Sequence, residues 1–175
     1  TFCCSEGRHL HSLYIEPLSR TAFAQYGDVI GGDMASEGVP INGGTTTRFT
    51  SEPLMLDTAQ GKGNALLYRA RGQSLPLMLH ELERHRLGSQ TFVPLAGVNF
   101  VVVVALSDDN DQAPNLQTLR AFWVDGSHAI TIRAGTWHHG LIAAQDGDFV
   151  VIERVATPVD CDTFEFKQPI ELKPR

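Results

Sequence analysis

The segment Phe100-Val101-Val102-Val103-Val104-Ala105-Leu106 is the longest apolar run of this 175-residue chain. It is far shorter than the ~20 apolar residues that a membrane-spanning helix needs, and it is typical of a buried strand. Other short apolar runs lie on both sides, separated by turns rich in Asp, Asn and Gly. They cover residues 75–82, 91–95, 119–124, 129–132, 141–144 and 149–155. Many short strands with little helix predict a mainly β fold, an antiparallel sandwich or barrel.

One short helix is predicted before this series of strands. Ser19 stands at the N-cap position ahead of residues 20–26, and Gly27 follows as a stop signal. Residues 31–47 are rich in Gly, Ser and Thr, and we expect them to form a long loop that covers or lines a site. We expect residues 1–12 to be a mobile tail and residues 13–175 to be a single domain.

Composition narrows the classes of partner. The chain carries 20 acidic and 14 basic residues, a net charge of −6, and shows no basic stripe. Nucleic acid is therefore not an expected partner, and no apolar run predicts a membrane segment. Cys3, Cys4 and Cys161 are too few and too unevenly spaced for a disulfide framework. They favour a reducing compartment, and we expect a cytoplasmic protein.

Two clusters of polar residues are each tied to a predicted strand. The first, His80-Glu81-Leu82-Glu83-Arg84-His85, precedes the strand at residues 91–95, and the second is Arg133-Ala134-Gly135-Thr136-Trp137-His138-His139. Ionisable groups at this density beside a core segment are costly to bury unless they face a cavity or bind something. The two clusters therefore predict one site assembled from two parts of a sheet.

The second cluster resembles the second motif of the cupin superfamily, in which a Pro-x-Gly-x-x-His turn delivers a histidine into a β-barrel. Gly135 and His138 take the glycine and histidine places. The first cupin motif has two histidines, two residues apart, followed by a carboxylate, and Glu83, His85 and Gln90 take these places. The resemblance implies a cupin-type β-barrel, a jelly-roll-like double-stranded β-helix, with one or two short helices. Because side chains alternate along a strand, Glu83 and His85 are expected to share its inner face.

This pattern leaves two interpretations of the site open. In one, Glu83, His85, Gln90 and His138 are ligands of a divalent metal ion, for which Ni, Mn, Zn or Fe would suit the mixed nitrogen and oxygen donors. In the other, the same residues form a metal-free polar pocket that hydrogen-bonds to a substrate. No organic cofactor is expected.

Two arginines are candidates for holding a small carboxylate. Arg48 follows the glycine-rich segment, and Arg69 ends the apolar run Leu66-Leu67-Tyr68. An arginine at a strand end that faces a cavity can grip a carboxylate through two parallel hydrogen bonds. The alternative for each is an ordinary surface ion pair.

Longer segments resemble the ureidoglycolate lyase family, in one order from about residue 13 to residue 162. The long block from His80 to Leu95 is the most specific of them. The segments are Leu18-Ser19-x-x-Ala22-Phe23-x-x-Tyr26-Gly27-Asp28-Val29-Ile30, Ile41-Asn42-x-Gly44 with Arg48, Leu75-Pro76-Leu77, His80-Glu81-Leu82-Glu83-Arg84-His85, Leu87-Gly88-Ser89-Gln90, Phe92-Val93-Pro94-Leu95, Val101 to Ala105, Leu119-Arg120-Ala121-Phe122, Gly135-x-Trp137-His138-His139 and Cys161-Asp162.

The resemblance implies a carbon–nitrogen lyase of the amidine-lyase type, which splits (S)-ureidoglycolate into glyoxylate and urea in the breakdown of allantoin. It implies Glu83, His85 and His138 as catalytic residues, and a homodimer by analogy with other cupins. The residues implied in substrate binding are Asn42, Arg48, Arg69, Gln90 and Trp137. Two alternatives remain open: a metal-dependent cupin oxygenase or isomerase for a small hydroxy or keto acid, and a cupin that binds such an acid without turnover.

Overall fold

The computed structural model describes residues 11–32, 34 and 36–175, and most of the predicted tail lies outside them. The described chain is mainly β, with one short α-helix. In chain order its elements are β1 (Ser12–Pro17), α1 (Arg20–Phe23), β2 (Gly27–Ile30), β3 (Val39–Ile41), η1 (Asn42–Gly44), β4 (Thr46–Arg48), β5 (Lys62–Ala70), β6 (Leu77–Arg84), β7 (Gln90–Pro94), β8 (Phe100–Ala105), η2 (Leu116–Thr118), β9 (Arg120–Val124), β10 (Ala129–Ile132), β11 (Trp137–His138), β12 (Ile142–Ala143), β13 (Gly147–Val155) and β14 (Asp162–Lys173).

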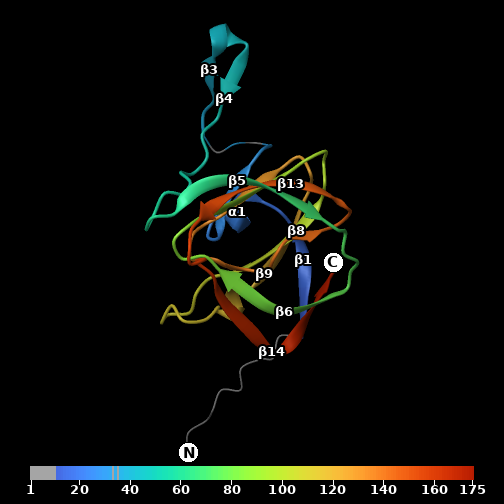
Figure 1. The fold of residues 1–175 in the computed structure, drawn as a ribbon. Coiled ribbons are helices and arrows are strands. Elements are labelled where there is room, and N and C mark those ends of the chain that lie inside the picture. Colours follow the sequence, from blue (N-terminus) through green and yellow to red (C-terminus); the bar gives the residue numbers. More distant parts are fainter. Residues whose placement is uncertain (1–10, 33, 35) are drawn as a thin grey trace, which may run out of the picture.

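The larger sheet closes on itself. Its strands follow the order β11-β6-β14-β1-β9-β8, and β8 also pairs with β11, which completes a ring. Figure 1 labels β6, β14, β1, β9 and β8 of this ring. β1 runs parallel to both of its neighbours, β14 and β9, whereas the other pairings of the ring are antiparallel. A closed ring leaves the strands within it no free edge. The predicted cupin-like β-barrel with little helix is confirmed.

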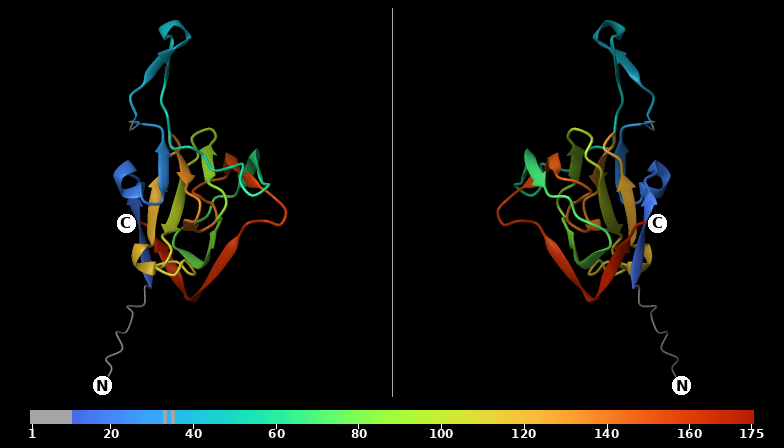
Figure 2. Two further views of the ribbon diagram at one scale, coloured as in Figure 1. Left: turned by 90° about the vertical axis from the view of Figure 1, so that its left-hand side faces the viewer. Right: turned by 90° about the vertical axis from the view of Figure 1, so that its right-hand side faces the viewer.

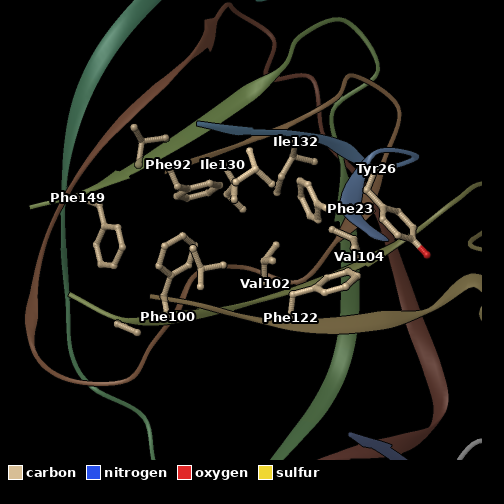
Figure 3. Packing of buried hydrophobic residues seen from close by; sticks show 14 of the residues in the cluster. Phe23, Tyr26, Phe92, Phe100, Val102, Val104, Phe122, Ile130, Ile132 and Phe149 are labelled. Atoms are coloured by element: carbon tan, nitrogen blue, oxygen red, sulfur yellow. The ribbon is translucent and has the colours of Figure 1, made fainter. Parts of the chain in front are cut away.

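A second sheet, in the order β2-β10-β7-β13-β5, packs against one side of the ring. Between them lies a core rich in aromatic rings, to which β8 contributes Phe100, Val102 and Val104 (Figure 3). The alternate residues of β8, Val101, Val103 and Ala105, belong to a second core with members from every strand of the ring. The apolar run is continuous because β8 is buried on both faces.

The predicted helix is present but short. The side chain of Ser19 accepts a hydrogen bond from the backbone N–H of Ala22, which confirms the N-cap, and the helix ends at Phe23. Gly27 does more than stop the helix, because it begins β2 against β10. A Cβ atom at Gly27 would come within 1.8 Å of the carbonyl oxygen of Thr131, so only glycine allows this approach.

The prediction of one long loop over residues 31–47 is wrong. Strands β3 and β4 pair as a hairpin, and Asn42, Gly43 and Gly44 take positive φ angles in the turn between them. Figures 1 and 2 show this hairpin projecting away from the barrel. Residues 42–50 are exposed, so within one chain this segment covers no site. No helix in the described ranges is both long and apolar enough to cross a membrane.

The core between the ring and the second sheet predicts that truncating one of its side chains destabilises the fold more than truncating an exposed side chain. Phe122 is fully buried and meets Phe23 edge-on at 5.6 Å between ring centroids. Phe122→Ala should lower the free energy of unfolding by about 3–5 kcal/mol, because it leaves a cavity. Leu67→Ala, on a side chain that is 59% exposed, should change it by less than about 0.5 kcal/mol. Urea titrations of both variants test this, and equal losses would contradict the assignment of the core.

Candidate active site

Glu83 and His138 are brought face to face by strand pairing. They are register partners where β11 pairs with β6, and Glu83 Oε1 lies 3.5 Å from His138 Nε2. His85 follows the last residue of β6, and its ring centroid is 5.3 Å from that of His138. One ligand atom from each of these residues lies within 4.8 Å of the others. The structure therefore unites the two polar clusters, and we call Glu83, His85 and His138 the site trio.

Backbone carbonyls fix the two imidazole rings. His85 Nδ1 is 2.6 Å from the carbonyl oxygen of Asp160, and His138 Nδ1 is 3.0 Å from that of Thr136. A carbonyl oxygen only accepts, so both Nδ1 atoms donate, and whenever such a ring is neutral its Nε2 atom carries a lone pair. Both Nε2 atoms are buried and have no hydrogen-bond partner among the described residues. Two oriented lone pairs beside a carboxylate are what a metal ion or a transferred proton requires.

The carboxylate of Glu83 is kept ionised by its neighbours. His138, when it is protonated at Nε2, donates the hydrogen bond that is the largest cause lowering the pKa of Glu83. Burial opposes this effect, and the positive charges of protonated His138 and His85 add to it. The thiol of Cys161 also donates to Glu83, with 3.8 Å between Sγ and Oε2. Burial and the nearby Glu83 raise the pKa of Cys161, so this thiol remains a donor at neutral pH. Glu83 can thus bind a cation or accept a proton.

Gln90 is buried on β7 and belongs to a chain of polar side chains. Its Nε2 donates to Glu153 Oε2 at 2.5 Å, which leaves its Oε1 buried without a partner among the described residues. Glu153 Oε1 accepts from the hydroxyl of Tyr68 at 3.2 Å. Burial and then the charge of Glu153 raise the pKa of Tyr68 to about 12, so the phenol stays protonated. Gln90 is thereby held with its carbonyl oxygen free.

Glu153 and Arg154 are functional candidates that the sequence analysis missed. Together with His85 and Asp160 they line a cleft, whose remaining walls are Gly88, Ser89, Val155, Ala156 and Val159. A signal for Glu153 existed, because it shares a strand face with the core residues Phe149 and Val151. Arg154 donates to the carbonyl oxygens of Thr58 and Ala59 at 2.8 and 2.9 Å. These partners are neutral, so the positive charge of Arg154 remains available to an anion in the cleft.

Arg84 holds in place the chain segment around Asp160, whose backbone carbonyl binds His85. Its side chain is 1% exposed, pairs with Asp162 at 2.7 Å and Asp111 at 2.5 Å, and stacks on Trp137 at 4.3 Å. Asp162 lies two residues from Asp160, whose carbonyl orients His85. Arg84 therefore supports the site without entering it.

The other predicted substrate-binding residues lie elsewhere in the single chain. Trp137 is buried in the ring core between Arg84 and Phe164. Arg69 pairs with Asp148 at 2.9 Å. It stands five residues beyond Asn64, which faces Glu153; at ~3.3 Å per residue this is roughly 16 Å along β5. Asn42 and Arg48 are exposed on the projecting hairpin.

Comparison with known proteins identifies the family of the chain. A profile described as ureidoglycolate lyase matches residues 10–173. The chain belongs to the ureidoglycolate lyase family. Among similar proteins named ureidoglycolate lyase, one from Escherichia coli is 42% identical over 151 residues, 86% of this chain and 91% of that protein. Another from Pseudomonas fluorescens is 40% identical over 166 residues, 93% and 96% of the two chains. A third, from Pseudomonas putida, is 39% identical over 162 residues, 91% and 94%.

The Arg84 anchor makes this ureidoglycolate lyase family member sensitive to acid. The Arg84 hydrogen bond is the main cause lowering the pKa of Asp162, and hydrogen bonds from Ser107 and then Arg86 lower that of Asp111. Lowered carboxyl pKa values stabilise the fold above the ordinary aspartate pKa of ~3.9, and this stability is lost as pH falls through the folded-state values. We expect stability in urea to fall below about pH 5.

Asp162→Asn should lower stability at pH 7 and flatten this decline, whereas Asp109→Asn, on the same exposed loop as Asp111, should do neither. Urea titrations at pH 7, 5 and 3 measure both effects. If Asp162→Asn kept the wild-type dependence of stability on pH, the ion pairs of Arg84 would not be the cause of the acid sensitivity.

Proposed function

We propose that this protein is a ureidoglycolate lyase that splits (S)-ureidoglycolate into glyoxylate and urea, as a carbon–nitrogen lyase of the amidine-lyase type. The names of the related proteins support the substrate. The observation that carries the proposal is the site trio, in which two buried imidazole Nε2 atoms converge on one carboxylate beside a cleft.

The reaction needs no added water and moves one proton. The hydroxyl O–H of the substrate loses its proton as the carbonyl of glyoxylate forms, the C–N bond breaks with its electron pair going to nitrogen, and that nitrogen gains a proton to leave as urea. One group must therefore accept a proton and one must deliver it. The substrate carboxylate must be held while this happens.

The site trio offers groups for both proton tasks. Glu83, ionised at neutral pH because its pKa is lowered, can accept the hydroxyl proton, and His85 Nε2 is the second acceptor nearby. His138 Nε2 lies 3.5 Å from Glu83 Oε1, within reach to pass a proton on to the departing nitrogen. Burial of the two Nε2 atoms strengthens their charge interactions with the substrate.

The same donor set fits a divalent ion. Two neutral imidazole nitrogens and a carboxylate oxygen are a common catalytic ligand set with open positions. Gln90, whose Oε1 has no partner among the described residues, stays a predicted fourth ligand. A bound Ni, Mn, Zn or Fe ion would supply Lewis acidity toward the hydroxyl and carboxylate oxygens of the substrate. We propose that Glu83, His85 and His138 hold it.

For the substrate carboxylate we propose Arg154 as the attracting charge, since it lines the same cleft as His85. Its Nε and one terminal nitrogen donate to the backbone carbonyls of Thr58 and Ala59, which fixes the position of the guanidinium. Arg69 would have to release Asp148 before it could serve as the predicted clamp. Arg48 is exposed on the projecting β3–β4 hairpin.

Freshly prepared ureidoglycolate tests the activity. We expect glyoxylate and urea in equal amounts without ammonia, which separates a lyase from an amide hydrolase. His138→Ala should lose about 10²–10⁴-fold in kcat/KM while keeping the wild-type far-ultraviolet spectrum. His128→Ala, a turn residue paired with Asp125 and away from the cleft, should retain wild-type kinetics.

Adding a chelator to the same assay tests whether turnover requires a metal ion. Turnover should be lost with chelator and restored by adding Ni, Mn, Zn or Fe. Unchanged turnover would mean that the site trio acts by proton transfer without a metal ion. Oxygen consumption or an isomerised acid would establish the oxygenase or isomerase alternative. A folded protein that binds the acid without turnover would contradict the lyase.

A further inference from the structure

The carboxylate of Glu83 and the imidazole of His138 point from the ring toward the second sheet. His138 is the register partner of Glu83 on one side and of Val104 on the other. Residues that are directly opposite in neighbouring strands point to the same face, and Val104 belongs to the core between the ring and the second sheet. The site trio is therefore directed at that core.

Gln90 and Glu153 point toward the same core from the second sheet. They are register partners where β7 pairs with β13. Gln90 stands two residues before Phe92, and Glu153 stands two residues after Val151; both of these apolar residues are core members, and Figure 3 labels Phe92 there. Because residues two apart on a strand share a face, the amide of Gln90 and the carboxylate of Glu153 face the ring. We call these two residues the acceptor pair.

The orientation of the Gln90 amide is fixed by its partner. A carboxylate only accepts hydrogen bonds, so the amide turns its Nε2 to Glu153 Oε2, 2.5 Å away, and its Oε1 to the other side. That oxygen is buried and has no partner among the described residues, in a side chain that is 5% exposed. A buried acceptor held without a partner indicates a ligand that donates a hydrogen bond.

Glu153 adds further capacity to accept hydrogen bonds. Its two oxygens accept one bond each, from Gln90 and from the hydroxyl of Tyr68, whereas a carboxylate has about four lone-pair positions. Burial, then the charge of Glu153 and then that of Glu83 raise the pKa of Tyr68 to about 12, so the phenol stays a donor to Glu153. Glu153 also lines the cleft that holds His85. The acceptor pair thus lies beside the site trio.

The two ends of ureidoglycolate differ in the hydrogen bonds that they need. The ureido group carries N–H donors on both of its nitrogens, whereas the other end is a carboxylate, which only accepts. The free Oε1 of Gln90 suits the N–H donors, and the negative charge of Glu153 disfavours the carboxylate. The ureido group therefore fits at the acceptor pair, while the carbon that carries the hydroxyl fits at the site trio.

We propose that Gln90 and Glu153 form the subsite for the ureido group, in which Gln90 Oε1 accepts a hydrogen bond from the terminal NH2, and that they select urea over an amide as the leaving group. This assignment rests on the proposed function. A substrate with a methyl group in place of that NH2 would leave the buried oxygen unpaired, and a site built for a hydrogen bond rejects such an analogue. Gln90 Oε1 then serves the substrate instead of a metal ion, and the site trio supplies the ligands.

The amide analogue 2-acetamido-2-hydroxyacetate tests the selection, because it replaces the terminal NH2 of ureidoglycolate with a methyl group. Glyoxylate release is measured from both compounds. Gln90→Met keeps the size of the side chain and removes the acceptor, so kcat/KM should fall about 10–100-fold on ureidoglycolate and less than about threefold on the analogue. Comparing variant with wild type on each compound cancels the intrinsic difference between the two leaving groups.

Gln117→Met, at an exposed glutamine of η2, is the matched control and should leave both rates unchanged. Equal losses on the two compounds in Gln90→Met would overturn the subsite, because damage to the fold or loss of a metal ligand lowers both rates alike. Glu153→Gln gives a second readout. The amide introduced there can donate to Gln90 Oε1, so KM for ureidoglycolate should rise more than kcat falls, and a wild-type KM would contradict the role of Glu153.

Inhibition by the leaving groups tests the subsite without turnover of the analogue. At concentrations below those that unfold the protein, urea should inhibit the wild type at least about tenfold more strongly than acetamide, and Gln90→Met should lose this difference. Equal inhibition of the wild type by both would overturn the subsite. If the wild type released no glyoxylate from ureidoglycolate, the proposed function would fail. Saturation-transfer NMR of urea and acetamide would then judge the subsite by the same ratio.

Discussion

Closure of the ring by β11 is the constraint on which the site depends. This two-residue strand pairs with β6 on one side and with β8 on the other, so His138 faces Glu83 and Val104 at once. Its neighbour Trp137 is buried against Arg84 in the ring core, which fixes the register. A slip of one residue would turn His138 to the opposite face. The hydrophobic packing of the ring thus sets the geometry of a polar centre.

The polar centre weakens the fold that holds it. Buried nitrogen and oxygen atoms are paired in most proteins, yet the Nε2 atoms of His85 and His138 and the Oε1 atom of Gln90 lack partners among the described residues. Each such atom costs about 1–3 kcal/mol when left unsatisfied. The anchor of Arg84 with Asp111 and Asp162 and the continuous cores on both faces of β8 offset that cost. The buried Nε1 of Trp137 is unpaired as well, so it is the convergence of His85 and His138 on Glu83 that supports a binding site there.

Much of the fold could be predicted where the signal is local. The apolar run of β8, the N-cap at Ser19 and the alternation that places Glu83 beside His85 need no knowledge of distant partners. The β3–β4 hairpin escaped prediction because Gly, Ser and Thr are typical of loops and its strands have three residues each.

The missed parts of the site depend on contacts across the sheets. Glu153 is part of the site because it accepts a hydrogen bond from Gln90, and Arg84 supports the site because it pairs with Asp162 on β14. The cleft is completed by the segment around Asp160. Periodicity in one strand shows which residues point inward, but not which strand lies opposite. The resemblance to the family predicted the overall fold, whereas only the structure revealed these contacts.

The convergence of both Nε2 atoms on one point can be measured directly by X-ray absorption at the zinc edge of zinc-loaded protein. We expect ligands that include imidazole nitrogens at ~2.0–2.1 Å, with the outer-shell signature of two rings. His138→Ala should reduce that signature to one ring. A zinc ion surrounded by oxygen alone, unchanged in His138→Ala, would contradict the assignment of Glu83, His85 and His138 as its ligands.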